Sequence, residues 1–251
     1  MSEFSNCRAL VVGGSTGIGR GIADAWASAG ARVLVLSRTA PVGPAAEKLK
    51  WAALDLSEPT AARTRLLQAA AKPLDFVCFS AVFYGERRCS LGETAEAEWR
   101  RQIDVNLHGL WLTLSTSLPA LRSAQPGVFV GVSSEVVFNA GPGRSGYAAT
   151  KAAGASLLAS LAAEEDPSQL RIVQLLPSGM VDTPGIRRRR ASDFDFRSYQ
   201  TPDCFRHVAL EILRTRCNDM NGESLVVDGS GDWHSVRTAI PVSQSRSAHH
   251  A

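Results

Sequence analysis

Cysteine is scarce in this chain and shows no pattern. The sequence has 251 residues and five cysteines, an odd number, scattered without the paired spacing of a metal site. Such usage argues against a disulfide framework or a zinc site and favours a reducing compartment. We therefore predict that the chain holds no metal.

Long apolar runs are also absent. The longest uncharged stretch, residues 105–121, contains Asn106, His108, Gly109 and Pro119, and it is too short and too polar to span a bilayer. The N-terminal sequence MSEFSNCRAL includes an acidic residue and no apolar signal core. We therefore expect a cytoplasmic protein that contacts no membrane.

Neither sign of charge dominates. The formal net charge of +3 does not by itself imply a nucleic-acid partner, and no interleaving of basic and aromatic residues points to one. Hydrophobic residues make up 45% and charged residues 20% of the chain, which excludes a disordered or collagen-like protein. The length suits one domain with a full core, and no linker divides it, so we predict a single domain over residues 1–251.

Short apolar runs alternate with amphipathic stretches along most of the chain. The runs are β-branched or continuously apolar, as expected of strands covered on both faces. This alternation predicts a parallel sheet with right-handed crossovers. The expected fold is α/β, of the Rossmann type: a doubly wound sheet of about seven parallel strands with helices on both faces. The predicted strands are residues 8–12, 32–37, 51–56, 74–80, 127–134, 170–176 and 223–228, and the predicted helices are residues 18–29, 58–71, 95–122, 146–165 and 202–216.

Two segments break this rhythm. Residues 183–200 have no clear period and follow the sixth predicted strand, so we expect an irregular segment there. From about residue 231 to residue 251 the chain is polar and carries no motif. That composition fits a disordered tail and equally a tail that contacts another subunit.

A glycine-rich loop lies between the first predicted strand and the first predicted helix. Gly13, Gly17 and Gly19 allow a sharp turn and a close approach to a pyrophosphate, and the start of the helix supplies free N–H groups. Glycines also form ordinary turns, but the strand before this loop and the helix after it favour nucleotide binding. We predict a dinucleotide site.

The end of the second predicted strand bears on the choice of cofactor. An acidic residue there would accept hydrogen bonds from the adenosine ribose and select NAD, but the strand ends in Ser37 and Arg38. Arg38 offers a fixed charge and a planar fork that suit a 2′-phosphate. The alternative for Arg38 is a solvated surface arginine. We predict NADP(H) as the cofactor.

A tyrosine and a lysine with helical spacing are the strongest candidates for catalysis. Tyr147 and Lys151 share one face of a predicted helix. An ammonium roughly 5 Å from a phenol, at an effective dielectric near 20, lowers the phenol pKa by roughly 2, as acid–base catalysis requires. Ser134 ends the fifth predicted strand, at the sheet edge where ligands bind, and its hydroxyl can hold a substrate oxygen. Taken singly, each residue also has an ordinary structural role as an alternative.

The GxxxGxG loop, Ser134 and the Tyr147-x-x-x-Lys151 pair together resemble the short-chain dehydrogenase/reductase family, in the branch of about 250 residues that includes 3-oxoacyl-carrier-protein reductases. The resemblance covers residues 8 to about 230. It implies a catalytic tetrad of Asn106, Ser134, Tyr147 and Lys151, in which Asn106 holds a helix kink and a proton-relay water. It also implies a homotetramer or homodimer.

The resemblance also implies which residues contact the cofactor. Asp55 is expected near the adenine, although it is equally placed to cap the next helix. Thr183 is expected at the nicotinamide carboxamide, and residues 183–200 are expected to form a substrate lid. The full set of expected contacts is Gly13, Ser15, Thr16, Gly17, Ile18, Gly19, Ser37, Arg38, Asp55, Leu56, Ser80, Tyr147, Lys151, Gly179, Val181 and Thr183.

The chain departs from the family pattern at three places. Val12 stands where the family loop opens with threonine. Phe79-Ser80-Ala81-Val82 replaces Asn-Asn-Ala-Gly after the fourth strand, and Pro177-Ser178-Gly179 displaces the proline of a Pro-Gly pair by one residue. We expect altered affinity or loop geometry, with the chemistry kept.

Basic residues gather around the expected lid. They are Arg187, Arg188, Arg189 and Arg190 in the lid, Arg87, Arg88, Arg100 and Arg101 after the fourth strand, and Arg144 before Tyr147. They indicate either a solvated face or a site for an anionic partner: a carboxylate, a phosphate or an acidic carrier protein. Several aromatic residues fall in the same segments, and the sequence leaves open whether they line an apolar pocket or only pack against their neighbours. They are Phe83, Tyr84, Phe138, Phe194, Phe196 and Tyr199.

The sequence thus predicts an NADP(H)-dependent oxidoreductase that reduces a ketone to a secondary alcohol, with Tyr147 as general acid–base. The expected small-molecule substrate is a biosynthetic ketone, such as a 3-oxoacyl thioester or another anionic or aromatic ketone. An alcohol or dihydrodiol dehydrogenase that runs oxidatively uses the same tetrad and stays an alternative. A non-catalytic NADP(H)-binding sensor is disfavoured, because such proteins typically lose the tyrosine or the lysine.

Overall fold

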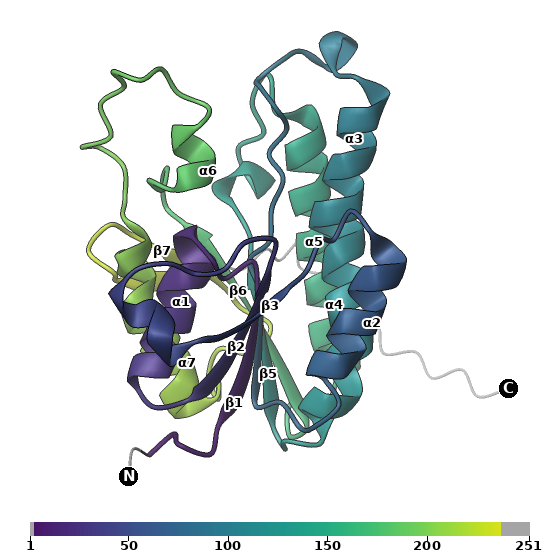
Figure 1. Cartoon of the computed structure of the whole chain (residues 1–251), viewed down its shortest axis with the longest axis vertical. Coiled ribbons are helices and arrows are strands. Elements are labelled where there is room, and N and C mark those ends of the chain that lie inside the picture. The colour runs from purple at the N-terminus through teal and green to yellow at the C-terminus, as the bar shows by residue number, and fades with distance from the viewer. Residues whose placement is uncertain (1–2, 237–251) are drawn as a thin grey trace, which may run out of the picture.

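A computed structural model of the protein describes residues 3–236, in which eight strands form one sheet in the order β3-β2-β1-β4-β5-β6-β7-β8. The sheet occupies the middle of Figure 1. Strands β1 to β7 all pair in parallel, so the predicted doubly wound α/β sheet is confirmed. The strands are β1 (Arg8–Val12), β2 (Arg32–Ser37), β3 (Lys50–Ala53), β4 (Phe76–Phe79), β5 (Gly127–Val132), β6 (Leu170–Pro177), β7 (Ser224–Val227) and β8 (Trp233–Ser235).

The eighth strand was not predicted. It pairs antiparallel with β7 and places Trp233 opposite Val227. Trp233 packs against the core, and its ring lies 4.8 Å from that of His207. The prediction of a tail from about residue 231 is therefore wrong for these residues, because the tryptophan anchors them. The rest of that segment, residues 237–251, lies outside the described residues.

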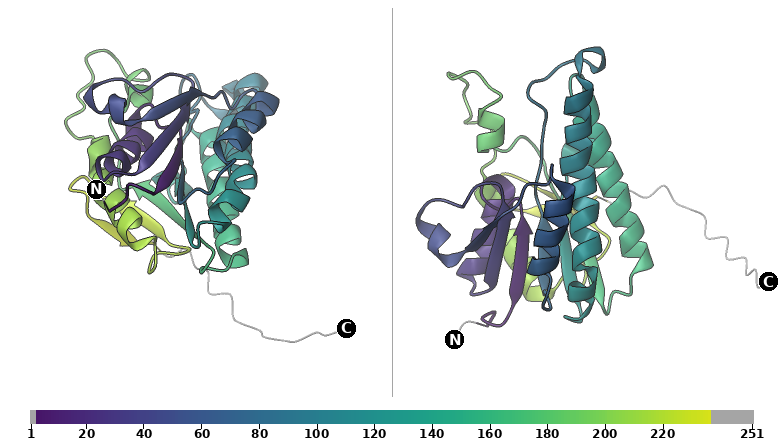
Figure 2. Two further views of the ribbon diagram at one scale, coloured as in Figure 1. Left: turned by 60° about the horizontal axis from the view of Figure 1, so that its bottom comes forward. Right: turned by 45° about the vertical axis from the view of Figure 1, so that its right-hand side comes forward.

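Helices cover both faces of the sheet, as Figure 2 shows. Trp26 ties the two helices of one face together, since its indole N–H donates to the Ala209 carbonyl at 2.9 Å. Neighbouring residues of β1 enter separate cores: Val11 faces these helices, and Leu10 faces the other layer. The first layer holds α1 (Gly17–Ser28) and α7 (Phe205–Thr215), and the second holds α2 (Pro59–Ala69), α4 (Gly109–Arg122) and α5 (Ser145–Glu164).

The helix predicted over residues 95–122 contains a widened turn. Helix α3 (Glu96–Gln102) continues into a π-helical segment, η3 (Ile103–His108), and then into α4. Asn106 lies in this wide turn and is buried. Such π segments often mark functional sites. The helix distortion that the resemblance implied is present.

The remaining elements are short. Residues 183–200, expected to be irregular, contain the short helix α6 (Pro184–Arg187) and are otherwise irregular, apart from an isolated bridge between Gln200 and Val181. Thr183 begins α6 by accepting a hydrogen bond from the Ile186 N–H at 3.3 Å, and a proline occupies the first helical position. The 3₁₀ segments are η1 (Pro44–Lys48), η2 (Leu91–Glu93), η4 (Glu135–Val137) and η5 (Pro202–Cys204).

Residues 3–236 contain neither a membrane-spanning helix nor a cluster of metal ligands. No helix in this part of the chain is long and apolar enough to cross a membrane. No group of three or more His, Cys, Asp or Glu residues is arranged there to hold a metal ion.

Candidate active site

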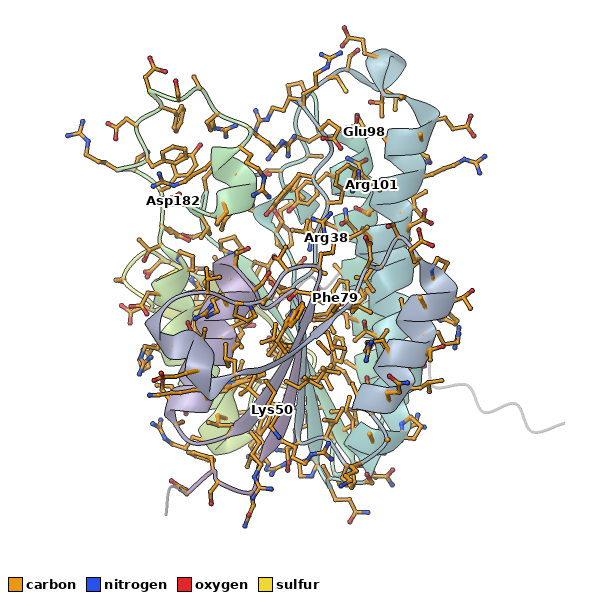
Figure 3. The ribbon with its side chains drawn as sticks, in the orientation of Figure 1. Arg38, Lys50, Phe79, Glu98, Arg101 and Asp182 are labelled. Carbon is orange, nitrogen blue, oxygen red and sulfur yellow. The ribbon has the colours of Figure 1, made fainter. Side chains whose placement is uncertain are left out.

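A cleft of about 900 Å³ opens at the carboxyl edge of the sheet. It lies where β1 and β4 are neighbours and the crossovers leave to opposite faces, which is the usual ligand site of an open α/β sheet. Figure 3 shows Asp182 on one side of this region and Glu98 and Arg101 of α3 on the other. The lining comes from the glycine loop, the ends of the strands, the start of α5 and the residues around α6.

The glycine loop forms one wall of the cleft. Gly13 has φ +85°, and a Cβ there would clash with the backbone nitrogen of Ala81. Gly17 has φ +62° and begins α1, and a Cβ on it would lie 3.1 Å from the methyl carbon of Thr183. The Thr16 side chain caps none of the N–H groups in the first turn of α1. This close-fitting loop at a helix start suits a pyrophosphate.

The predicted cofactor contacts separate into two groups. Gly19 does not line the cleft, because it packs behind the loop, where a Cβ would lie 2.6 Å from the Gly13 carbonyl oxygen and 2.8 Å from the Ser80 Cβ. Gly19 thus permits the close packing of α1 on the strand ends. The other predicted contacts line the cleft: Gly13, Ser15, Thr16, Gly17, Ile18, Ser37, Arg38, Asp55, Leu56, Ser80, Tyr147, Lys151, Gly179, Val181 and Thr183.

Arg38 and Asp55 lie close together at the β2–β3 end of the cleft. Asp55 accepts hydrogen bonds from the Ser57 N–H (2.9 Å) and hydroxyl (2.7 Å). Partial burial works against ionisation, but these bonds and Arg38 hold the pKa of Asp55 below its ordinary value. Arg38 is exposed, and no carboxylate within residues 3–236 lies at ion-pair distance from it. Its guanidinium can therefore take an anionic phosphate.

Tyr147 and Lys151 lie one turn apart on α5, with only 9% and 8% of their surfaces exposed. The Lys151 ammonium donates to the Val132 carbonyl at 2.8 Å, and burial lowers its pKa to about 8. Burial raises the pKa of Tyr147 well above its ordinary value, and the nearby Tyr84 adds to this. Burial outweighs the groups that oppose it, Ser134 and Arg144. The expected lowering of the tyrosine pKa by Lys151 stays a prediction.

Ser134 belongs to a network that the sequence did not indicate. Its hydroxyl donates to Glu135 Oε2 at 2.7 Å, and Arg144 donates to Glu135 Oε1 at 3.3 Å. Strand alternation would place neighbouring side chains on opposite sides. Ser134 is still extended, but the chain turns into η4 directly after it, so that Ser134 and Glu135 both line the cleft. Glu135 is thus a cleft residue that the sequence reasoning missed, and its only signal was its place beside Ser134.

Asn106 lies behind the cleft. Its side chain accepts from the Phe83 N–H (2.7 Å) and donates to the Phe83 carbonyl (2.9 Å) and the Thr150 hydroxyl (3.0 Å). Asn106 and Lys151 both line a small cavity of about 20 Å³, which is large enough for one water molecule. Asn106 therefore ties the wide turn of η3 to the loop after β4 and to α5. Its part in a proton relay stays a prediction.

Residues 8–193 match the family model of the short chain dehydrogenases. The chain belongs to the short-chain dehydrogenase family. Like its relatives in this family, it is an oxidoreductase. Enzymes of the family use NAD(P)(H).

Relatives of this short-chain dehydrogenase match it over most of its length. A 3-oxoacyl-[acyl-carrier-protein] reductase FabG of Chlamydia muridarum is 27% identical, over 91% of this chain and 98% of that protein. An uncharacterized oxidoreductase of Myxococcus xanthus is 33% identical, over 70% of this chain and 73% of that protein. The crystal structure of a 3-oxoacyl (acyl-carrier-protein) reductase from Agrobacterium tumefaciens with NADP bound is 27% identical with a TM-score of 0.78, and the match covers 90% of this chain and 94% of that one.

The arginines of this short-chain dehydrogenase fall into paired and unpaired groups. Arg187 pairs with Asp182, Arg144 with Glu135, Arg101 with Glu86, and Arg100 with Glu96, at 2.6–3.3 Å. Arg190 donates to the Tyr199 hydroxyl at 2.9 Å. Within the described part of the chain, the cleft-lining arginines without an ion pair are Arg38, Arg88, Arg188, Arg189 and Arg190.

The aromatic residues divide in the same way. Phe194, Phe196 and Tyr199 pack on one another with ring centroids 4.9–5.5 Å apart, and they do not line the cleft. Phe83 and Tyr84 do line it, whereas Phe138 does not and is 48% exposed. Phe194, Phe196 and Tyr199 therefore pack together, and Tyr84 is the aromatic side chain placed next to Tyr147, with ring centroids 5.0 Å apart.

Proposed function

We propose that this short-chain dehydrogenase is an NADP(H)-dependent reductase that converts a ketone into a secondary alcohol. The observation that carries the proposal is the meeting of Ser134, Tyr147 and Lys151 in the cleft that the glycine loop also lines. A relative named for 3-oxoacyl reduction and a similar structure with NADP bound support it.

The residues of the cleft fit the cofactor. The loop around Gly13 and the start of α1 would hold the pyrophosphate. Arg38 would hold the 2′-phosphate, which favours NADP(H) over NAD(H). Lys151 and Thr183 would hold the nicotinamide half. NADPH, when bound, supplies the hydride that the carbonyl carbon takes up.

Tyr147 donates its phenolic proton to the carbonyl oxygen, which completes the alcohol. The phenol is protonated near neutral pH, which is the state that reduction needs. The oxidative alternative uses the same tyrosine, as a tyrosinate that accepts the alcohol proton. Ser134 orients the carbonyl, and Asn106 acts at a distance by fixing the wide turn behind Lys151.

Three further features belong to this proposal. Residues 183–200 would form the substrate lid over a single catalytic domain. The substrate would be a biosynthetic ketone, and the protein would work in the cytoplasm as a homodimer or homotetramer. The exposed Trp111 of α4 is available for such an assembly, being 43% exposed. Sedimentation that gives only a monomer would rule the assembly out.

The test is the loss of NADPH absorbance with a panel of ketones: a 3-oxoacyl thioester, free and on a carrier protein, a quinone and a small cyclic ketone. We expect turnover by the wild type and a loss of at least about a hundredfold in the Tyr147→Phe variant. NADPH affinity of the variant, measured by fluorescence titration, should be unchanged and serves as the control for folding. Wild-type turnover by Tyr147→Phe would remove the tyrosine from this role.

A further inference from the structure

Arg189 is held over the cleft by the short helix α6. Its backbone N–H donates to the Ile186 carbonyl at 3.0 Å, and Ile186 is buried. Tyr84 packs under the same helix, since a Cβ on Gly185 would lie 3.5 Å from the Tyr84 ring. The Arg189 side chain is half-buried and lines the cleft. Its position is therefore set by packed neighbours.

A single aromatic ring separates Arg189 from the proposed general acid. The Arg189 guanidinium carbon lies 5.5 Å from the centre of the Tyr84 ring, and the Tyr84 and Tyr147 rings lie 5.0 Å apart. Burial raises the pKa of Tyr84 to about 12, so its phenol is neutral near neutral pH and forms no ion pair with Arg189. A short molecule can therefore reach from Tyr147 to Arg189.

The charges around Arg189 are mostly of its own sign. Burial and then Arg88 lower the pKa of Arg189, Arg190 adds a smaller lowering, and Tyr84 and Glu98 oppose them. Glu98 accepts a hydrogen bond from the Glu86 N–H at 3.1 Å. Neither Glu98 nor any other carboxylate of residues 3–236 lies at ion-pair distance from Arg189.

Other arginines of the same region are balanced. Arg187 pairs with Asp182 at 2.6 Å, and Arg197 pairs with Asp195 at 2.7 Å. Arg189 is half-buried and lies near Arg88, which is also unpaired. Desolvation and like-charge repulsion make this arrangement unfavourable in free energy unless an anion binds between the two guanidinium groups. A carboxylate matches the planar fork of arginine in shape and charge.

We propose that Arg189, with Arg88 beside it, binds a carboxylate carried by the ketone substrate itself. The proposal rests on the reductase function proposed above and names its substrate class: short-chain keto acids whose carbonyl lies at Tyr147. Arg189 is half-buried and lines the cleft beside Tyr84, so a carboxylate on the substrate itself can reach it. Arg189 is thus a specificity-determining residue.

Binding tests the proposal without turnover. Levulinate and its uncharged methyl ester are titrated by calorimetry into the wild type and into Arg189→Gln, Arg189→Lys and Arg197→Gln, each saturated with NADP⁺. We expect levulinate to bind the wild type at least about tenfold more tightly than the ester. Arg189→Gln should remove this preference, Arg189→Lys should restore part of it, and Arg197→Gln should keep it. Equal or absent binding of the two compounds, or a preference that survives in Arg189→Gln, would overturn the proposal.

Turnover separates this proposal from the reductase function. If the wild type oxidises NADPH with neutral ketones and with keto acids equally, and Tyr147→Phe does not, the reductase function stands and the carboxylate site fails. If it reduces no ketone, yet levulinate binding depends on Arg189, the anion site stands and the reductase function fails. A preference for acetoacetyl coenzyme A over acetoacetate, lost in Arg189→Gln, would assign Arg189 to the coenzyme phosphates and overturn the carboxylate.

Discussion

The Ser134 hydroxyl donates its hydrogen to Glu135 Oε2 at 2.7 Å, while the Val136 N–H donates to the Ser134 oxygen at 3.3 Å. The serine proton is therefore directed to a carboxylate. A hydrogen bond with Ser134 opposes the rise in the pKa of Tyr147. We infer that Glu135 sets the direction of the Ser134 hydroxyl beside Tyr147.

Replacing Glu135 by glutamine tests this relationship. An amide oxygen accepts more weakly than a carboxylate and gives Arg144 no ion pair, so the Ser134 hydroxyl should lose its fixed direction. We expect kcat for ketone reduction to fall about tenfold with the KM for NADPH unchanged. Glu96→Gln, which removes an exposed ion pair with Arg100 on α3, is the matched control. An unchanged kcat in Glu135→Gln would show that Ser134 needs no such partner.

The pKa of Lys151 predicts an alkaline limit for activity. Burial lowers it to about 8, so the ammonium is present below this pH and is lost above it. We expect kcat/KM for reduction to fall as the pH rises through about 8. Lys151→Arg keeps its charge, so its slower reaction should show no such fall. A wild-type profile that stays flat to well above this value would contradict the assignment.

The lowered pKa of Lys151 also makes the free energy of unfolding depend on pH. An unfolded lysine keeps its proton up to the ordinary value of 10.5, whereas the folded protein releases it near 8. The unfolded state therefore binds more protons between these two values. The contribution of Lys151 to the free energy of unfolding should rise with pH in this window, and Lys151→Met should remove that dependence in urea titrations.

Arg38 should decide the choice between the two dinucleotides. Arg38→Ser removes the guanidinium that we propose binds the 2′-phosphate, so the KM for NADPH should rise about tenfold or more while that for NADH stays the same. Arg32→Ser, an exposed arginine at the other end of β2, is the control. Strong wild-type preference for NADH would show that Arg38 is a solvated surface residue.

Asn106 should matter for stability as well as for turnover. Its side chain makes three hydrogen bonds, two with the Phe83 backbone and one with Thr150, in a buried position. Asn106→Ala leaves these groups unpaired, and we expect a loss of about 2–3 kcal/mol in the free energy of unfolding by urea. Thr150→Val removes one partner and should cost about 1 kcal/mol. Equal stability of Asn106→Ala and wild type would contradict the role of this side chain.

Local patterns in the sequence determined the frame of this protein. The alternation of strand and helix predicted seven parallel strands, because strands buried on both faces must be continuously apolar. The glycine loop lies where the pattern placed it, at the end of β1 and the start of α1. Four-residue spacing placed Tyr147 and Lys151 on one helix face, because helix geometry is local.

Only the tertiary structure decided how the groups of the cleft are charged, paired and directed. Burial raised the pKa of Tyr147, and burial depends on residues far along the chain such as Tyr84. The turn into η4 placed Glu135 beside Ser134, although strand alternation would separate them. The four consecutive arginines 187–190 cannot be distinguished in the sequence, yet Arg187 forms an ion pair and Arg189 does not. These differences arise because desolvation and ion pairing depend on distances in space, which sequence spacing does not fix.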